Sequence, residues 1–471
     1  MATSKTNIFY PGSLRSGAIV GAFLFALCDG SAVATDERPS SDTPPHIVFF
    51  LTDDMRFDAM GCAGNPIVQT PRIDRLASEG TMFRNSFVTT SICMTSRASF
   101  LTGQYESRHR ITDFNMPLSA EAFAETFPAL LRQAGYYTGF VGKWGIGGAL
   151  PTEQFDYFSG FPGQGRYFEE GDPEHLTRKL TRQALQFLDE VPSGRPLLLC
   201  ISYKAPHAQD QAERQFPPDP AYETLYRDVT IPVPVTATPE AFATLPEFLQ
   251  RSEGRTRWER RFATPEMYQE TVKDYYRLVT GVDASVGTIL DRLKQDGLDE
   301  RTVVIFTSDN GFYLGEHGLA GKWFMHEESI RIPLIVRDPR TPTTVRGRQV
   351  DAMALNIDLA PTILELADLD VPDAMQGRSL ASWLRGGSPA WRTEFFYEHT
   401  FDYASRIPPC EGVRTDRYKY VRYVQADPVY EALFDLGQDP HEQHNLAGDP
   451  ARSALLDELR ESWKRWRHKV R

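Results

Sequence analysis

Short runs of apolar residues recur along the chain, and most are rich in β-branched and aromatic side chains. A strand that is apolar along its whole length is typical of a sheet covered on both faces. We therefore predict buried strands over residues 46–51, 136–141, 197–202, 302–307 and 332–336.

Helical patterns lie between these runs. The clearest covers residues 265–296, where apolar residues form a stripe, Thr264 is a suitable N-cap, Pro265 suits the first turn and Gly297 ends the helix. Similar patterns predict helices over 121–133 and 175–190. Strands that alternate with helices predict an α/β fold with a large, mostly parallel sheet flanked by helices on both faces. Functional residues in such folds lie at the carboxyl ends of the strands.

The pattern changes near residue 371. Short strands are predicted over 414–424 and 432–436, followed by a closing helix over 455–470. We therefore expect a catalytic α/β domain over 46–370 and a small antiparallel C-terminal subdomain over 371–471.

Residues 206–261 break the rhythm of strands and helices, because they are rich in Pro, Glu and Arg. We predict a long surface excursion over the sheet, with some local helix. Its cluster of Arg255, Arg257, Arg260 and Arg261 suits either a polyanionic substrate or a solvated helix face, and the pattern favours the solvated face.

The N-terminus has the features of a signal peptide over residues 1–34, followed by a linker over 35–45. Lys5 and Arg15 precede an apolar run over 17–27, and Ala32-Val33-Ala34 is a suitable cleavage site. We expect export to the periplasm or the medium; a membrane anchor is the alternative. No apolar run in the sequence is long enough to predict a membrane span.

Composition narrows the functional classes. The 471 residues include 51 Lys and Arg against 63 Asp and Glu, a formal net charge of −12, which argues against a nucleic-acid partner. An anionic substrate must therefore be bound by a local positive site. Five cysteines, at positions 28, 62, 93, 200 and 410, are scattered and have no zinc-site spacing.

Acidic and amide side chains follow two of the predicted strands. Asp53 and Asp54 come after strand 46–51, and Asp309 and Asn310 come after strand 302–307. Such oxygen ligands suit Ca²⁺ or Mg²⁺ better than zinc. The alternative is that these residues only begin turns, but two clusters at equivalent positions favour a metal.

Cys93 begins a run of small and polar residues that leads into a predicted helix. A nucleophile at this point would face the positive end of the helix dipole, and Arg97 four residues later could hold its charge. A buried structural cysteine is the alternative.

The run from Cys93 to Gly103 resembles the signature of the formylglycine-dependent sulfatases. Further similar motifs occur in order over residues 46–450: Asp53-Asp54, Gly142-Lys143-Trp144, Ala205-Pro206-His207, Asp309-Asn310-Gly311, Gly315-Glu316-His317-Gly318, Lys322 before Glu327-Glu328-Ser329-Ile330-Arg331-Ile332-Pro333, and the tail Arg417-Tyr418-Lys419-Tyr420. Residues 311–317 resemble the carbohydrate-directed branch, including N-acetylglucosamine-6-sulfatase-like enzymes.

The resemblance implies an alkaline-phosphatase-like sandwich with a small C-terminal subdomain. It implies that a formylglycine-generating enzyme converts Cys93 to formylglycine, whose hydrate has one hydroxyl to attack sulfur and a second to expel sulfate. It also implies one divalent cation, Ca²⁺ with Mg²⁺ as the alternative. Its ligands would be Asp53, Asp54, modified Cys93, Asp309 and Asn310.

The resemblance also assigns roles to individual residues. Arg97 would hold the hydrated aldehyde, and Lys143 and Lys322 would neutralise the sulfate. Asp309 could take the nucleophile's proton, and His207 would protonate the leaving oxygen.

Two positions depart from the family pattern. Thr95 stands where Pro or Ala is usual, which bears on recognition by the modifying enzyme. Gly145 stands where a histidine usually helps to expel sulfate, so a water or another side chain must serve. His317, His326 and His399 are candidates for that task; the first two flank Lys322 and suit either substrate contact or loop packing.

The sequence therefore favours a sulfuric ester hydrolase acting on a sulfated carbohydrate or another sulfated small molecule. A phosphate or phosphonate ester hydrolase of the same superfamily is one alternative. A non-catalytic descendant that binds sulfated glycans is the other.

Overall fold

The computed structural model describes residues 44–401, 403 and 406–471. The predicted signal peptide and nearly all of the predicted linker lie outside this part. Thr43–Arg471 form one compact unit. In the described part no helix has the length and apolar character needed to cross a membrane.

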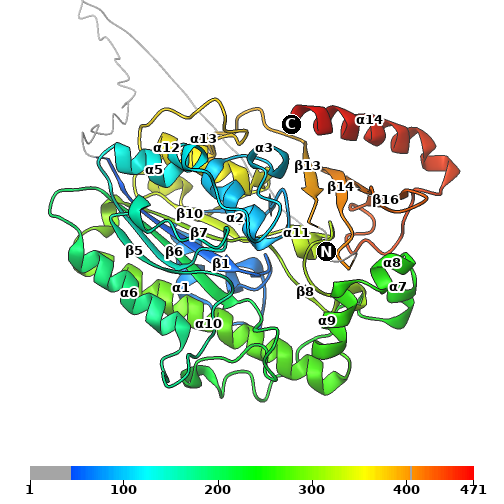
Figure 1. The fold of residues 1–471 in the computed structure, drawn as a ribbon, viewed down its shortest axis with the longest axis horizontal. Helices are drawn as coiled ribbons and strands as arrows, with labels where there is room; N and C mark the ends of the chain where they lie inside the picture. Colours follow the sequence, from blue (N-terminus) through cyan, green and yellow to red (C-terminus); the bar gives the residue numbers. More distant parts are fainter. Residues whose placement is uncertain (1–43, 402, 404–405) are drawn as a thin grey trace, which may run out of the picture. The chain divides into compact units, whose positions relative to one another are not determined.

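An eight-stranded sheet forms the centre of this unit (Figure 1). Its spatial order is β11-β2-β10-β7-β1-β6-β4-β5. The strands are β1 (His46–Asp53), β2 (Thr81–Phe83), β4 (Tyr137–Lys143), β5 (Tyr157–Phe161), β6 (Leu197–Pro206), β7 (Thr302–Ser308), β10 (Leu334–Arg337) and β11 (Arg348–Val350).

The five neighbouring strands β7-β1-β6-β4-β5 are parallel, and β10 is antiparallel to both β7 and β2. The prediction of a mostly parallel sheet is therefore confirmed. Because the parallel strands share a direction, their carboxyl ends meet at one edge.

Helices cover both faces of the sheet (Figure 1). One face carries α1 (Pro71–Glu79), α6 (Leu176–Glu190) and α10 (Pro265–Gln295), and the other carries α2 (Cys93–Thr102), α5 (Phe127–Gln133) and α12 (Leu359–Leu366). Alternate residues of β1 enter the two cores: Ile47 and Phe49 pack under α2 and α5, whereas Val48 and Phe50 pack under α6 and α10.

A separate four-stranded antiparallel sheet follows near the C-terminus. It contains β13 (Glu394–His399), β14 (Cys410–Thr415), β15 (Tyr418–Tyr423) and β16 (Tyr430–Asp435), and α14 (Ser453–Lys469) packs against it. The sequence predicted antiparallel strands and the closing helix, but it missed β13 and all of β14 except Arg414 and Thr415. The domain boundary at residue 371 stays a prediction.

Shorter elements complete the unit. They are β3 (Ser86–Phe87), β8 (Tyr313–Leu314), β9 (Ala320–Gly321), β12 (Ala354–Leu355), α3 (Glu106–His109), α4 (Ala120–Ala124), α7 (Pro239–Ala243), α8 (Glu247–Gln250), α9 (Glu253–Arg261), α11 (Glu327–Ile330) and α13 (Ala381–Leu384).

The prediction of one helix over 121–133 is wrong, because these residues form two helices, α4 and α5. Pro128 lies in the first turn of α5, and Thr126 before that turn has extended backbone angles. Proline suits a helix start but cannot donate to the preceding turn, which separates the two helices. By contrast, α10 begins as predicted, with the Thr264 side chain accepting a hydrogen bond from the Met267 amide.

Candidate active site

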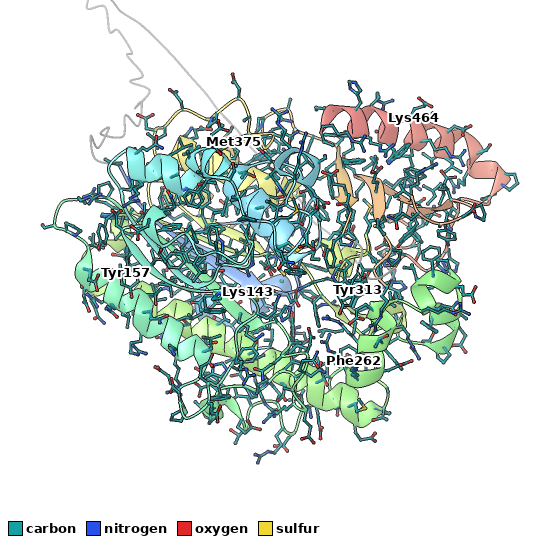
Figure 2. The ribbon with its side chains drawn as sticks, in the orientation of Figure 1. Lys143, Tyr157, Phe262, Tyr313, Met375 and Lys464 are labelled. Carbon is teal, nitrogen blue, oxygen red and sulfur yellow. The ribbon has the colours of Figure 1, made fainter. Side chains whose placement is uncertain are left out.

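Four adjacent strands each place a predicted site residue at the same edge of the sheet. In spatial order these are Asp309 after β7, Asp53 in β1, His207 after β6 and Lys143 in β4. Figure 2 shows Lys143 in the interior of the molecule. Parallel strand order therefore brings together residues that are up to 256 positions apart in the sequence.

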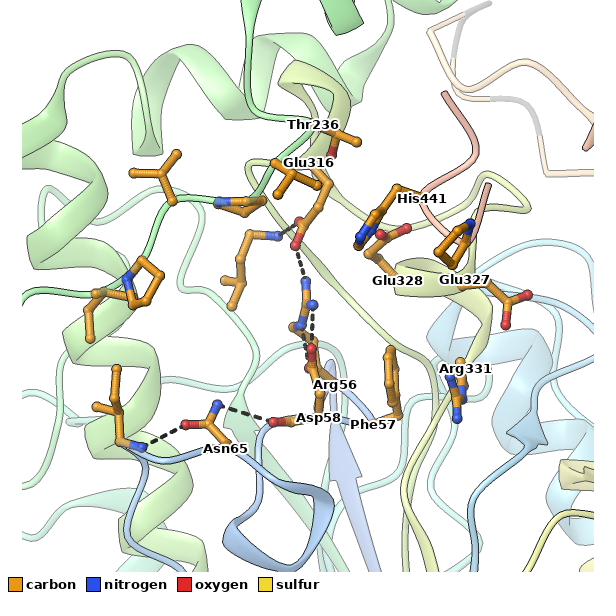
Figure 3. Close-up of a pocket in the computed structure, with 18 of the residues that line it drawn as sticks. Arg56, Phe57, Asp58, Asn65, Thr236, Glu316, Glu327, Glu328, Arg331 and His441 are labelled. Carbon is orange, nitrogen blue, oxygen red and sulfur yellow. Dashed lines mark hydrogen bonds and ion pairs between the residues drawn. The ribbon is translucent and has the colours of Figure 1, made fainter. Parts of the chain in front are cut away.

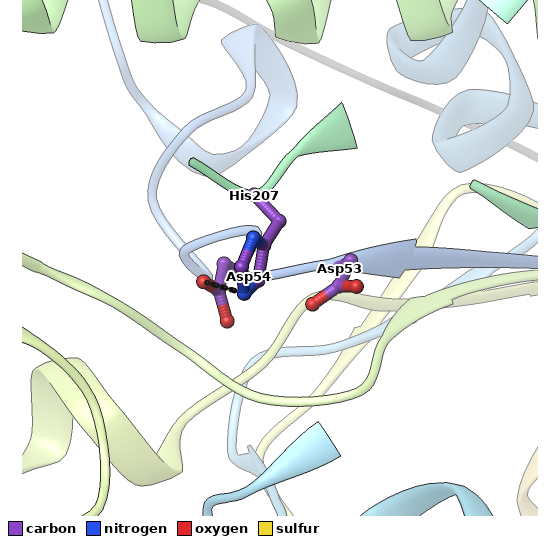
Figure 4. Close-up of side chains that lie close together, drawn as sticks. All are labelled: Asp53, Asp54 and His207. Carbon is purple, nitrogen blue, oxygen red and sulfur yellow. Dashed lines mark ion pairs between the residues drawn. The ribbon is translucent and has the colours of Figure 1, made fainter. Parts of the chain in front are cut away.

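The acidic residues form the base of this site. Ligand atoms of Asp53, Asp54 and His207 lie within 4.8 Å of one another (Figure 4). The Asn310 Nδ2 amide donates to Asp54 Oδ1 over 2.5 Å, and the Asp54 amide donates to Asp309 Oδ1 over 3.2 Å. Asp54 adopts a left-handed φ of 65°, a conformation that is uncommon outside functional turns.

A tyrosine from α10 stabilises that turn. The Tyr275 hydroxyl donates to the Asp54 carbonyl over 2.7 Å and accepts from the Arg56 amide over 3.0 Å. Tyr275 is fully buried, so the predicted long helix fixes the backbone of a predicted ligand.

The acidic cluster suits a divalent cation. Asp53 Oδ1 and Asn310 Oδ1 are buried, and neither has a hydrogen-bond partner among the described residues. Buried polar atoms are normally hydrogen-bonded, so a carboxylate oxygen and an amide oxygen that lack hydrogen bonds, beside the Asp54 and Asp309 carboxylates, match an oxygen-ligand metal site.

Cys93 is the first residue of α2 and is 1% exposed. Burial opposes the charge of Arg97, but Asp309, Asp53 and the Cys93 sulfur together raise the Arg97 pKa, so Cys93 lies within electrostatic range of the cluster. The four described cysteines, at positions 62, 93, 200 and 410, are unpaired. The predicted nucleophile is therefore a free thiol at a helix start.

Arg97 connects the helix to the strand ends. Its Nε donates to Asp309 Oδ2 over 2.8 Å, and its Nη2 lies 3.3 Å from Asp53 Oδ2. Its Nη1 donates to the Lys143 carbonyl over 2.8 Å and to the Ser202 hydroxyl. These contacts fix the guanidinium between α2, β7 and β4.

Two lysines, one at the end of β4 and one in the loop after β9, pair with the carboxylates. Lys143 Nζ pairs with Asp53 and donates to Gln164 Oε1 over 2.6 Å. Lys322 Nζ pairs with Asp54 and lies 3.9 Å from Asp53 Oδ1. Both side chains are almost fully buried, so each interaction acts in a medium of low dielectric constant.

His207 closes the site from the loop after β6. Its Nδ1 donates to the Ala208 carbonyl over 2.6 Å, and its Nε2 lies 3.6 Å from Asp54 Oδ2. Burial lowers the His207 pKa well below its usual value. The ring is therefore neutral here, with Nε2 toward the acidic cluster.

The charges inside the cluster shift one another's pKa values. Burial disfavours ionised Asp53, but the cations around it, led by Lys143, hold its pKa well below the usual range. Burial, followed by repulsion from Asp53, raises the pKa of Asp309 to about 7. Groups with pKa values driven apart in this way are typical of catalytic sites.

The two departures from the family pattern have distinct settings. The Thr95 hydroxyl donates to the Ile111 carbonyl over 2.8 Å, which ties α2 to the loop after α3. Gly145 has a φ of +75°, and a Cβ atom there would lie 2.9 Å from Arg97 Cδ. The usual histidine side chain does not fit this backbone.

The three candidate replacements for that histidine are all buried. His317 and His326 stack on each other with ring centroids 4.4 Å apart, and His326 Nδ1 lies 2.6 Å from the Tyr313 hydroxyl. These contacts match the packing alternative for both residues. His399 is in β13 of the C-terminal sheet, 6.4 Å from the Phe401 ring.

Sequence reasoning missed three polar neighbours of the site. Ser202 and Lys204 lie in β6 near its carboxyl end, so the rule about strand ends could have identified them. Burial, followed by repulsion from Lys143, lowers the Lys204 pKa to about 8. Gln164 reaches Lys143 from the loop between β5 and α6, and no sequence signal singled it out.

A cavity of about 570 Å³ adjoins the segment after Asp54 (Figure 3). Arg56 crosses its wall, donating to both oxygens of Asp58 over 2.7 Å and to Glu316 over 2.5 Å. The Arg56 contacts tie the β1 loop to the segment that precedes Lys322. This cavity contains none of the strand-end residues described above.

Comparison with known proteins identifies this arrangement. The sulfatase family model matches residues 45–369, which is most of the chain. The chain belongs to the sulfatase family. A second model, N-sulphoglucosamine sulphohydrolase C-terminal, matches residues 315–469. The protein is therefore a sulfuric ester hydrolase, and the fold predicted from the sequence is confirmed.

Several relatives of this sulfatase extend over nearly its whole length. N-acetylglucosamine-6-O-sulfatase of Bacteroides thetaiotaomicron is 30% identical, with 86% of this chain and 83% of the relative covered. Ulvan-active sulfatase of Formosa agariphila is 28% identical, with coverages of 95% and 85%.

Solved structures of related enzymes have a similar fold. The structure of a protein with its substrate D-glucosamine-2-N,6-O-disulfate has a TM-score of 0.78 and 27% identity, covering 91% of this sulfatase and 98% of that chain. Phosphonate monoester hydrolase of Silicibacter pomeroyi has a TM-score of 0.77 and 25% identity, with coverages of 91% and 96%.

Proposed function

We propose that this sulfatase hydrolyses a sulfate monoester on a carbohydrate. The observation that carries the proposal is the acidic oxygen cluster at adjacent strand ends, whose carboxylates pair with the buried Lys143 and Lys322. Cys93 interacts electrostatically with Arg97, which holds Asp309 of this cluster. The carbohydrate is supported by two relatives, named as an N-acetylglucosamine-6-O-sulfatase and an ulvan-active sulfatase. Export, with residues 1–34 as signal peptide, is part of the proposal.

Two groups complete the proposed site. A formylglycine-generating enzyme converts Cys93 to formylglycine, which supplies the attacking hydroxyl. Asp53, Asp54, Asp309, Asn310 and modified residue 93 would hold one divalent cation, Ca²⁺ or alternatively Mg²⁺, and this cation would supply Lewis-acid stabilisation of the sulfate charge. The unpaired oxygens of Asp53 and Asn310 support this ligand set.

The cationic side chains bind the sulfate. Lys143 pairs with Asp53 and Lys322 pairs with the neighbouring Asp54, so an anion bound at these carboxylates meets two ammonium groups. Buried donors of this kind contribute about 3 kcal/mol each to transition-state stabilisation. Arg97, anchored on Asp309 and the Lys143 carbonyl, orients residue 93.

Two side chains move protons. Asp309 accepts the proton of the nucleophile, and its raised pKa of about 7 makes a carboxylate a stronger base than usual. His207 faces the leaving oxygen with Nε2 while Nδ1 stays bonded to the Ala208 carbonyl. This hydrogen bond fixes the ring orientation throughout. Because the neutral ring carries its only proton on Nδ1, Nε2 must first take up a proton before it passes one to the leaving oxygen.

Phosphonate ester hydrolysis is the second candidate, because the phosphonate monoester hydrolase shares the fold at 25% identity. Two lysines also suit a phosphoryl group. Rates on 4-nitrophenyl sulfate and phenylphosphonate 4-nitrophenyl ester separate the two activities, and we expect the sulfate to be preferred.

Mass spectrometry of the peptide that carries residue 93, purified from the native cell, tests the proposal. The peptide should have lost the thiol sulfur and gained an aldehyde. The same preparation should release sulfate from a panel of sulfated monosaccharides. An intact thiol in an active preparation would overturn the proposed nucleophile.

A further inference from the structure

The loop that carries His207 is bridged to the loop that carries Lys322 by one helix, α9. Asp210 lies three residues after His207 and accepts from Arg257 Nη1 over 3.2 Å and from Arg261 Nη2 over 2.5 Å. The Arg257 guanidinium lies 4.9 Å from the ring centroid of Trp323, the residue after Lys322. These contacts connect Arg257 to the loops that carry His207 and Lys322.

This cluster has more positive than negative charge. Arg257 and Arg261 share Asp210, while Arg257 and Arg406 share Glu253. Three guanidinium groups therefore meet two carboxylates. Lys204, whose charge interacts with Asp210, adds a further cation.

Part of the excess positive charge lies in the protein interior, on Arg261. Its side chain is only 2% exposed, and its Nη1 is buried without a hydrogen-bond partner in the part of the chain that the structure describes. The prediction of a solvated helix face is therefore wrong for Arg261, although it holds for Arg260, which is exposed. A buried guanidinium with an unpaired nitrogen is costly unless an anion lies near.

Arg257 is the partly exposed member of the cluster that also contacts Trp323, the residue after Lys322. Its side chain is 20% exposed, with Nε bound to Glu253 and Nη1 to Asp210. Nη2 has no acceptor among the described side chains and carbonyls. The side chain is thus held rigid with one donor free, which suits recognition of an oxyanion.

We propose that Arg257, supported by Asp210 and Arg261, binds a second anionic group of the substrate, a sulfate or a carboxylate, on the sugar that carries the scissile ester or on its neighbour. This inference rests on the proposed carbohydrate function. It makes the enzyme selective for multiply charged sugars.

A pair of probes tests the inference: D-glucosamine 2-N,6-O-disulfate and N-acetylglucosamine 6-O-sulfate, which differ in one anionic group. The kcat/KM for each is measured with the wild type, Arg257→Gln and the exposed control Arg260→Gln. We expect the wild type to favour the disulfate, and Arg257→Gln to reduce that preference about tenfold, mainly through KM. The control should behave like the wild type.

Two further measurements separate binding from folding. Arg257→Lys keeps the charge and should restore part of the preference, and 4-methylumbelliferyl sulfate, which has one anionic group, should be hydrolysed equally by all variants. Equal preference in the wild type and Arg257→Gln, or no preference in the wild type, would overturn the inference alone. A different result would instead overturn the carbohydrate function. In that case the enzyme would hydrolyse the aryl sulfate but would cleave neither of the two probes and none of the sulfated sugars in the panel.

Discussion

Gly145 offers a direct test of how tightly Arg97 is held. A Cβ atom at this position would lie 2.9 Å from Arg97 Cδ and 3.5 Å from Lys143 Cε, and φ is +75°. Gly145→Ala therefore introduces both backbone strain and a collision with a residue that binds Asp309. Gly148 in the same loop provides the control, because its added Cβ would have no neighbour within 4 Å.

The expected magnitude follows from these two effects. A left-handed conformation disfavours a non-glycine residue by about 1–2 kcal/mol. Displacing the Arg97 guanidinium weakens its charged hydrogen bonds to Asp309, each worth about 1.5–3 kcal/mol. We expect Gly145→Ala to lower the free energy of unfolding by about 2 kcal/mol and kcat at least tenfold, since 1.4 kcal/mol corresponds to a factor of ten.

Urea unfolding and the rate of aryl sulfate hydrolysis measure the two effects. Gly148→Ala should leave the rate unchanged and leave stability unchanged or slightly raised, because alanine restricts the unfolded chain. Gly145→His, which restores the family pattern, should also lose activity, since its Cβ meets the same atoms. Wild-type stability and rate in Gly145→Ala would refute the account of a crowded guanidinium.

Three further outcomes are expected. Cys93→Ala should abolish sulfate release while the far-UV circular dichroism stays native, since no other described side chain takes the place of the nucleophile at the start of α2; residual turnover above the uncatalysed rate would contradict this. Dialysis against EDTA should remove the release of sulfate, and added Ca²⁺ should restore it. Activity that survives metal-free dialysis would contradict the proposed cation site at Asp53, Asp54, Asp309 and Asn310. Burial, followed by repulsion from Glu398, raises the pKa of Glu106 to about 8, so the folded state holds a proton that the unfolded state loses above about pH 4.5. Stability should therefore fall as the pH rises from about 5 to 8, and Glu106→Gln should reduce this fall in thermal midpoints; an unchanged slope would contradict the assignment.

Much of the site was predictable because it depends on local sequence at strand ends. The apolar runs identified β1, β6 and β7, and the polar residues that follow them supplied Asp53, Asp309 and His207. The roles assigned to these residues stay proposals.

Other features depend on tertiary structure, which sequence pattern does not encode. The antiparallel direction of β10 is set by its pairing with β7 and β2, and a short apolar run has the same appearance in either direction. Arg261 has the sequence setting of a surface residue, yet it is buried because Phe216 and Phe312 lie beneath it. Gln164 lies in the loop between β5 and α6, and sequence pattern does not show that this loop reaches Lys143.

The burial of Cys93 has a consequence for the order of events in the cell. In the folded protein this thiol, on the first residue of α2, is 1% exposed. A processing enzyme cannot reach a side chain so enclosed, so the proposed conversion of Cys93 would have to come before the chain finishes folding. The fraction of converted enzyme then depends on the rate of Cys93 conversion relative to the rate of folding. A variant that folds more slowly should therefore contain a larger converted fraction.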